Sequence, residues 1–489
     1  GVLVSTAVSI GLNRKIDNVV KTDTFARTAD SFHNLWDKLW ITCMEMDLEM
    51  SLVYGKKPYI NIDDWDTPFP SSDIKNANLQ DFYADKYSID RLSKFMRIYN
   101  ELYPLVSSLH RLREPPSIEH VMLQINSVTK LCNELYPVSL QEGYLTAGVF
   151  SLDVINSIKS ILVIYPFIIN VQYYLLLHFE STDQFDKFLT VFNQAIDNVL
   201  YALQISVGAF VRIFTTMSAH ALMLNAYIIQ AVNKIIYILL SFSVHVRLAS
   251  YRVESQISKE GDRMYSEVRE SQEKLKKQFE SLRENIFEIM KLANKCPAFS
   301  LEHYYTSFRS YGNCKCLIGW TKQGGKPIFD FEDPSWLEHS NLIERFSYEQ
   351  VQSINKRMEK FLSLDSCVNL SQMTRRWTSN PESNTFKFKD FCPKIDASGK
   401  IVLNTGMLNY KNSNNENMGM KMEHAFSGNE SGSSLLSEKQ DKTSDNDESI
   451  LGTLTSADPS FEGLESADNW LQIPDLVDSL DIMSEFGML

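Results

Sequence analysis

Residues 35–70 read LWDKLWITCMEMDLEMSLVYGKKPYINIDDWDTPFP, and this stretch decides how the N-terminal part of the chain folds. Apolar residues recur in it every three or four positions, the spacing that places them on one face of an α-helix. They are Leu35, Leu39, Cys43, Met46, Met50 and Val53. Gly55 favours a left-handed end to this helix, and Pro58 prevents its continuation. The spacing therefore predicts a helix that packs this face into a core, followed by an extended acidic surface segment at 61–70.

The same stretch resembles the signature block in the regulatory region of fungal zinc-cluster transcription factors. In that family a helix rich in Leu and Trp leads to an Asp, a Ser, a Gly-Arg-Pro-like turn and an extended acidic segment that ends in Pro. The matching residues here are Leu35, Trp36, Leu39, Trp40, Asp47, Ser51, Gly55, Lys56 and Pro58, followed by Asp63, Asp64, Asp66 and Pro70. The run Tyr173-Tyr174-Leu175-Leu176 resembles a second feature of the family, a buried helix of the regulatory region.

The resemblance implies a nuclear factor of RNA polymerase II transcription. In the family, DNA is bound by a six-cysteine binuclear zinc cluster, usually followed by a short coiled coil, and several members are switched by a small-molecule effector. The sequence starts at Gly1 and enters an apolar run at once, so we expect a fragment of a longer protein. The zinc and the DNA contacts would then belong to the missing N-terminal part, and this chain would hold no cofactor of its own.

The net charge of −13 is concentrated at the C-terminal end. Residues 441–489 contain 12 acidic residues and one basic residue, a balance of −11, which leaves −2 for residues 1–440. A nearly neutral body lacks the basic surface that phosphate contacts need, so this chain alone is not expected to bind DNA. A strongly acidic end is typical of an interaction tail.

Bulky apolar residues alternate with acids in the last twenty residues. The apolar members are Trp470, Leu471, Ile473, Leu476, Val477, Leu480, Ile482, Met483 and Phe486. Repulsion between the acids keeps these side chains available, and a helix formed on binding would fit a hydrophobic groove with a basic rim. This composition is typical of activation domains, and the resemblance implies a coactivator such as Mediator as the partner. The alternative is a C-terminal helix that docks on its own core.

The cysteines and the missing motifs argue against an enzyme. Seven dispersed cysteines without a Cys-x-x-Cys pair predict buried free thiols, and Cys314 and Cys316 are too close in sequence for a tetrahedral metal site. Gly324-Gly325-Lys326 is followed by Pro327, so it is not a phosphate-binding loop. Two other functions remain open at this point: a helical adaptor or co-regulator scaffold without DNA binding, and an α-helical enzyme of unrecognised type. Turnover of a bound small molecule would favour the enzyme.

Helical spacing throughout predicts an all-α protein: a large helical bundle regulatory domain at 1–400, a disordered linker at 401–460 and an acidic activation segment at 461–489. Residues 145–250 would be its centre and could house the effector pocket, although a dry core is the alternative. Residues 252–295 predict one long amphipathic helix. It would lie across the bundle or form a coiled-coil seam, which leaves a homodimer open.

Two apolar stretches, 161–177 and 219–242, could be taken for membrane spans. The first contains Pro166, Asn170 and Gln172, and the second contains Lys234. A charge and amides near the middle of a span are costly in lipid. Both stretches therefore predict buried helices of the bundle, with no membrane as a partner.

Overall fold

The computed structural model describes residues 1–19, 30–111, 113–136, 152–216, 222–260, 265–299, 311, 314–315, 318, 341–379, 394–395 and 401–402. The chain divides into two compact units, residues 1–379 and 380–489. The first unit contains every described helix, which confirms the predicted all-α fold. In the second, β1 (Lys394–Ile395) pairs antiparallel with β2 (Ile401–Val402). The predicted linker beyond residue 402 and the activation segment lie outside the described residues, and the predicted boundary at residue 400 stays a prediction.

The described N-terminal part is built of helices joined by turns. Its helices are α1 (Val2–Ser9), α2 (Ile16–Val19), α3 (Asp30–Tyr54), α4 (Phe82–Leu109) and α5 (Ile118–Leu135), with 3-10 turns η1 (Ile62–Asp64) and η2 (Ile74–Asn76) between α3 and α4. Asp81 begins α4 by accepting hydrogen bonds from the N–H groups of Tyr83 and Ala84. Ser117 begins α5 in the same way, directly after Pro115-Pro116. Local capping chemistry thus sets these helix starts.

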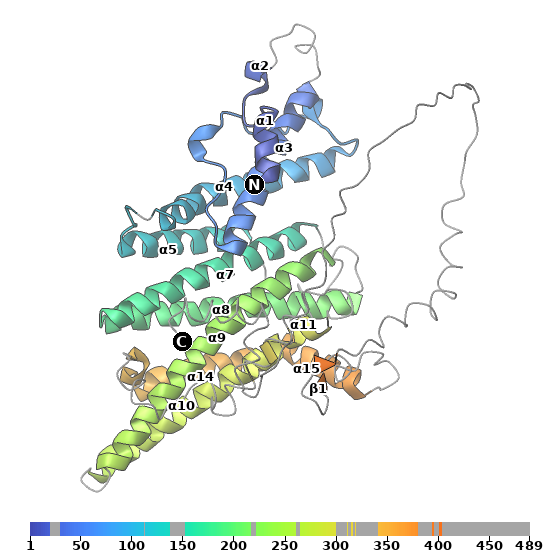
Figure 1. The fold of residues 1–489 in the computed structure, drawn as a ribbon. Coiled ribbons are helices and arrows are strands. Elements are labelled where there is room, and N and C mark those ends of the chain that lie inside the picture. The colour runs from blue at the N-terminus through green and yellow to red at the C-terminus, as the bar shows by residue number, and fades with distance from the viewer. Residues whose placement is uncertain are drawn as a thin grey trace, which may run out of the picture. The chain divides into compact units, whose positions relative to one another are not determined.

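The centre of the bundle is formed by three long apolar helices, α7 (Leu152–Ser181), α8 (Phe185–Thr216) and α9 (Leu222–Glu260). Figure 1 shows α5, α7 and α8 stacked one on the next, with α9 running obliquely and packing against α7 and α8. Phe192 of α8 contacts Phe242 of α9 and Phe346, with ring centroids 4.9 and 5.4 Å apart. The remaining elements are α10 (Ser266–Ala293), α11 (Lys295–Phe299), η4 (Leu342–Arg345), α14 (Tyr348–Leu362) and α15 (Asp365–Ser379).

By length and composition alone, α7, α8 and α9 could each cross a membrane. In the most apolar 18-residue stretch of each helix, 78%, 67% and 72% respectively is buried within the structure. One polar contact joins two of them: the Asn198 amide of α8 donates to Gln172 Oε1 of α7 at 3.0 Å. The first stretch predicted to be a buried helix lies in α7, and residues 222–242 of the second lie in α9. That no membrane is a partner stays a prediction.

Residues 252–295, predicted as one helix, comprise the end of α9 and all of α10. Gly261 and Asp262, between the two helices, are poor helix formers. The apolar residues Phe279, Leu282, Ile286 and Ile289 of α10 are fully buried, and α10 packs against α9 and α14. These side chains are therefore occupied within the bundle and are not free to form a coiled-coil seam with a second chain.

Candidate functional site on helix α3

The signature residues lie on α3 and on the segment that follows it. Trp40, Asp47, Ser51 and Pro58 are buried, and Trp36 is half-buried. Leu35, Gly55 and Lys56 are exposed. The structure thus separates the block into a buried set that builds the end of α3 and a set that faces solvent.

Helix α3 ends in a hydrogen-bonded left-handed turn. Gly55 has φ +62°, a conformation that side chains disfavour. The Lys56 N–H donates to Ser51 O at 3.1 Å, which satisfies one of the last carbonyls of the helix. The hydroxyl of Ser51 donates to Asp47 O at 2.8 Å. The left-handed end expected from Gly55 is therefore confirmed.

Asp47 fastens the chain that follows the turn to α3. Its Oδ2 accepts a hydrogen bond of 2.8 Å from the backbone N–H of Ile60, in a buried setting. The segment beyond Ile60 continues along the N-terminal residues: the Asn13 amide donates to Asp64 O, and the Thr67 hydroxyl donates to Leu12 O. The acidic part of the block is thus held at the surface by a buried carboxylate.

Replacing Asp47 with alanine is expected to lower the free energy of unfolding by about 1–3 kcal/mol, because the buried N–H of Ile60 loses its acceptor. The matched control is Asp64→Ala, because Asp64 is exposed and is fixed through its backbone carbonyl. Urea denaturation of both variants measures the difference. Equal losses for the two would show that Asp47 does not hold the segment.

Two side chains from distant helices bind the carbonyls at the end of α3. Lys234 Nζ of α9 donates to Leu52 O at 3.2 Å and to Val53 O at 2.5 Å. His110, directly after α4, places Nε2 3.1 Å from Gly55 O. Burial lowers the pKa of Lys234 to about 8. Its charge faces the negative end of the helix dipole, where cations are favoured.

A cluster of opposite charges fixes the middle of α3 to its neighbours. Arg91 Nη1 of α4 lies 2.5 Å from both carboxylate oxygens of Glu45. Lys159 Nζ of α7 lies 2.5 Å from Glu49 Oε1 and 5.5 Å from the ring centre of Tyr227 in α9. Burial alone would lower the pKa of Lys159, but the carboxylates of Glu49 and Glu45 outweigh it and raise that pKa. Sequence spacing did not reveal this cluster, because its members come from three helices.

The face of α3 that the sequence placed in the core is largely exposed, so this prediction is wrong. We call the six exposed apolar side chains of α3 the apolar stripe: Phe32, Leu35, Leu39, Met46, Met50 and Tyr54. They are between 37% and 60% exposed. The buried face carries Trp40, Ile41, Met44, Leu48 and Leu52 instead. The helix is apolar on both faces, so periodicity alone could not decide which face the bundle covers.

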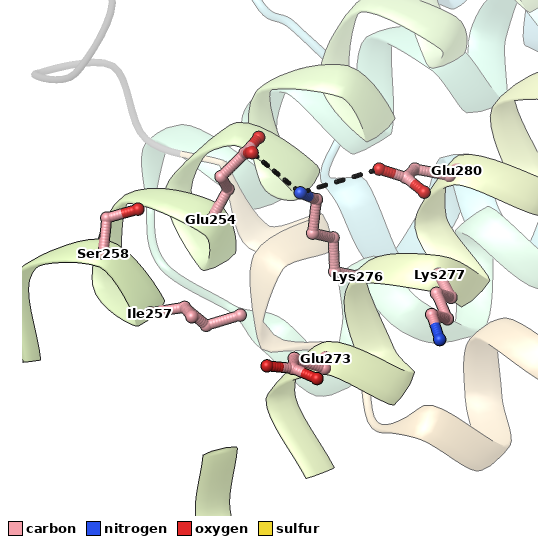
Figure 2. Close-up of a pocket in the computed structure, with 7 residues that line it drawn as sticks. All are labelled: Glu254, Ile257, Ser258, Glu273, Lys276, Lys277 and Glu280. Atoms are coloured by element: carbon pink, nitrogen blue, oxygen red, sulfur yellow. Dashed lines mark ion pairs between the residues drawn. The ribbon is translucent and has the colours of Figure 1, made fainter. Parts of the chain in front are cut away.

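A polar hollow lies between α9 and α10, away from α3. Figure 2 shows Lys276 of α10 between Glu254 of α9 and Glu280, at 2.8 and 3.8 Å. The hollow has a volume of about 280 Å³ and is also lined by Ile257, Ser258, Glu273 and Lys277. Its charges pair with one another at the surface, which is the arrangement of a solvated helix pair. The effector pocket predicted within residues 145–250 stays a prediction.

The nine apolar residues predicted to bind a coactivator, from Trp470 to Phe486, lie outside the described residues. Among the residues that the structure does describe, no group of three or more His, Cys, Asp or Glu side chains could hold a metal ion. Cys43, Cys132, Cys296, Cys314 and Cys367 are buried free thiols, as expected from their dispersal.

Comparison with known proteins adds no relative: no protein-family model, no curated protein and no solved structure matches this chain.

Proposed function

We propose that this chain is the regulatory and activation region of a fungal zinc-cluster transcription factor that acts in the nucleus. The supporting observation is that four signature residues form one local unit. Asp47 accepts from the N–H of Ile60, Ser51 accepts from the N–H of Lys56, and Gly55 supplies the left-handed turn between them. Asp47 acts through its carboxylate, Gly55 through its positive φ and Ser51 through a hydroxyl that donates to Asp47 O. These residue types therefore have a geometric task, which supports the resemblance to the family motif.

In this proposal the helical unit is the regulatory body and residues 461–489 are the activation segment. The acids of that segment speed the encounter with a basic coactivator surface, and its apolar side chains supply the affinity. In the proposal, DNA is bound by a zinc cluster, and the seven cysteines of this sequence do not form that cluster. The zinc ions are bound in the same cluster. A coactivator such as Mediator is the partner, and a small-molecule effector of the helical body is part of the same hypothesis.

A reporter assay in a fungal cell tests this function. We expect the full chain, fused to an unrelated DNA-binding domain, to activate transcription, and the same fusion truncated after residue 400 to lose most of that activity. Equal expression of the two fusions is checked by immunoblot. A full-length fusion that stays silent under all growth conditions, or a truncated fusion that activates equally well, would contradict the assignment.

A further inference from the structure

A histidine and a carboxylate meet where η4 packs on the central helices. His245 Nε2 of α9 lies 3.5 Å from Glu180 Oε2 of α7, and the two side chains are 22% and 10% exposed. The other carboxylate oxygen, Oε1, accepts a hydrogen bond from the N–H of Leu342 at 3.2 Å. The side-chain amide of Asn341 donates to His245 O at 2.9 Å. These contacts together join α7, α9 and the start of η4.

The second ring nitrogen of His245 decides what the first one can do. Nδ1 lies 3.0 Å from Ser241 O, and a carbonyl oxygen only accepts, so this contact needs a proton on Nδ1. A neutral imidazole has one N–H, and its Nε2 would then present a lone pair to the carboxylate of Glu180. The other neutral tautomer would move the same conflict to Ser241 O. Only the imidazolium, with a proton on each nitrogen, donates in both directions.

The charges nearby on the three elements are paired with one another. Arg252 Nη1 of α9 lies 2.6 Å from Glu344 Oε2 of η4. Arg345 Nη1 of η4 lies 2.5 Å from Asp183 Oδ1 in the turn after α7. Histidine differs from these residue types because its charge normally changes between pH 5 and 8. His245 is therefore the group through which pH acts on this contact.

The remaining surroundings are neutral. The Tyr173 hydroxyl of α7 is 2.5 Å from Ser241 Oγ, and burial raises the pKa of Tyr173 to about 12, so it carries no charge near pH 7. Phe346, directly after η4, is buried against Phe188 and Phe192 of α8. Thus η4 is held by apolar contacts that do not depend on pH and by one polar contact that does.

We infer that Glu180 and His245 form a proton-binding site that fastens η4 to α7 and α9 in acid and loosens it as the pH rises through neutrality. With the proton bound, the imidazolium donates to Ser241 O and to the carboxylate, which in turn accepts from the N–H of Leu342. Once the proton leaves, Nε2 and Oε2 face each other as two acceptors. The carboxylate then gains by turning toward water, which frees the Leu342 N–H.

The direction of the effect follows from the balance at the ring. Burial lowers the pKa of His245, but the hydrogen bond and the charge of Glu180 outweigh burial and raise that pKa above its ordinary 6.5. The contact is therefore complete below pH 6.5 and is lost as the pH rises through the higher pKa of the folded state.

The site lies at the start of the C-terminal part of the helical unit. Helix α14 follows η4 directly and packs against α10 and α8, and α15 also packs against α8. Protonation at Glu180 and His245 thus couples pH to the attachment of these last helices. The inference uses only these contacts and is independent of the proposed function, so either can fail without the other.

Amide hydrogen exchange of the full chain at pH 6, 7 and 8, corrected for the intrinsic exchange rate, tests the site. Protection of a peptide covering residues 341–346 is expected to fall by at least about threefold from pH 6 to 8, relative to residues 195–205 of α8. His245→Gln should remove this dependence, because the Gln amide does not titrate. His120→Gln, at an exposed position of α5, is the control and should keep it. Protection independent of pH in the wild type, a fall that survives His245→Gln, or a fall lost in the control would overturn the inference.

Glu180→Gln tests the shared proton through the sign of the effect. Its side-chain oxygen still accepts from the N–H of Leu342, and its amide donates to Nε2 of the neutral imidazole. The contact then favours the neutral ring, so protection of residues 341–346 should stay level or rise from pH 6 to 8. A fall as steep as in the wild type would contradict the site.

A third measurement needs no variant. Exchange of the ring C2 hydrogen of His245, followed by mass spectrometry across pH 5 to 9, gives the pKa of that ring directly. We expect a value above the ordinary 6.5. A value below 6.5 would show that the ring is neutral where the contact requires the imidazolium, and would overturn the inference.

Discussion

Replacing Asp85 with alanine is expected to lower the free energy of unfolding by about 3–5 kcal/mol, because the buried Lys38 ammonium loses its carboxylate. Lys38 Nζ lies 2.8 Å from Asp85 Oδ1, and only 10% and 3% of the two side chains is exposed. Asp85 also accepts from the N–H groups of Asn78 and Leu79. Burial raises the pKa of Asp85, but the hydrogen bond from Lys38, its charge and the two N–H groups outweigh burial and hold that pKa below its ordinary value.

A double variant separates the charge from the hydrogen bonds. Lys38→Met with Asp85→Asn removes both charges and keeps an oxygen that accepts from Asn78 and Leu79, so its loss should be less than half of that of Asp85→Ala. Glu270→Ala breaks the exposed pair between Glu270 and Lys274, and we expect no measurable change from it. Urea denaturation compares all three variants. A small loss for Asp85→Ala would show that the pair does not anchor α3 to α4.

Raising the pH from 9 to 10 is expected to destabilise the folded chain by at least about 2 kcal/mol. Burial raises the thiol pKa of Cys132 and Cys314 to about 12 and that of Cys367 to about 11, from an ordinary 9.0. Above pH 9 the unfolded chain therefore loses protons that the folded chain keeps. Each such thiol costs up to about 1.4 kcal/mol per pH unit.

Lys234 acts in the opposite direction. Its pKa of about 8 in the fold lies below its ordinary 10.5, so the unfolded chain binds more protons between pH 8 and 10.5 and the folded state gains stability there. Three thiols outweigh one lysine. Burial also raises the thiol pKa of Cys296 and the phenol pKa of Tyr136, Tyr173 and Tyr201, which adds to the net loss. Chemical denaturation under reducing conditions at pH 8, 9 and 10 measures it, and Cys132→Ala with Cys367→Ala should flatten the decline. Stability that rises between pH 9 and 10 would contradict this balance.

The sequence was informative where local chemistry decides the structure. Gly55 and Pro58 correctly marked the end of α3. The apolar composition of residues 145–250 correctly predicted a buried centre, because three successive helices there offer few polar faces. In each case residues close in sequence carry the information.

The site on α3 depends on partners far away in the chain, and these could not be predicted. Lys234 stood out only as a charge in an apolar stretch; its partners Leu52 and Val53 lie more than 180 residues earlier. Glu45 and Glu49 are half-buried because Arg91 and Lys159 form ion pairs with them. These pairs, together with the buried apolar residues Ile41 and Leu48, hold one side of α3 against its neighbours and leave the apolar stripe outward. The spacing of apolar residues shows that a helix has an apolar face, but it does not show which neighbouring helix covers that face.

Activation by residues 461–489 is the central claim, and one reporter measurement tests it most directly. The segment is fused to an unrelated DNA-binding domain, alone and with Trp470→Ala, Leu476→Ala and Phe486→Ala together. Each lost apolar anchor is expected to weaken coactivator binding by about 1–2 kcal/mol, so the triple variant should abolish activation. The matched control, Asn469→Ala with Gln472→Ala and Ser479→Ala, should retain it.

In the full chain the triple variant should leave the melting temperature of the helical unit unchanged. A silent wild-type segment, or a triple variant that activates normally or destabilises the helical unit, would contradict the account.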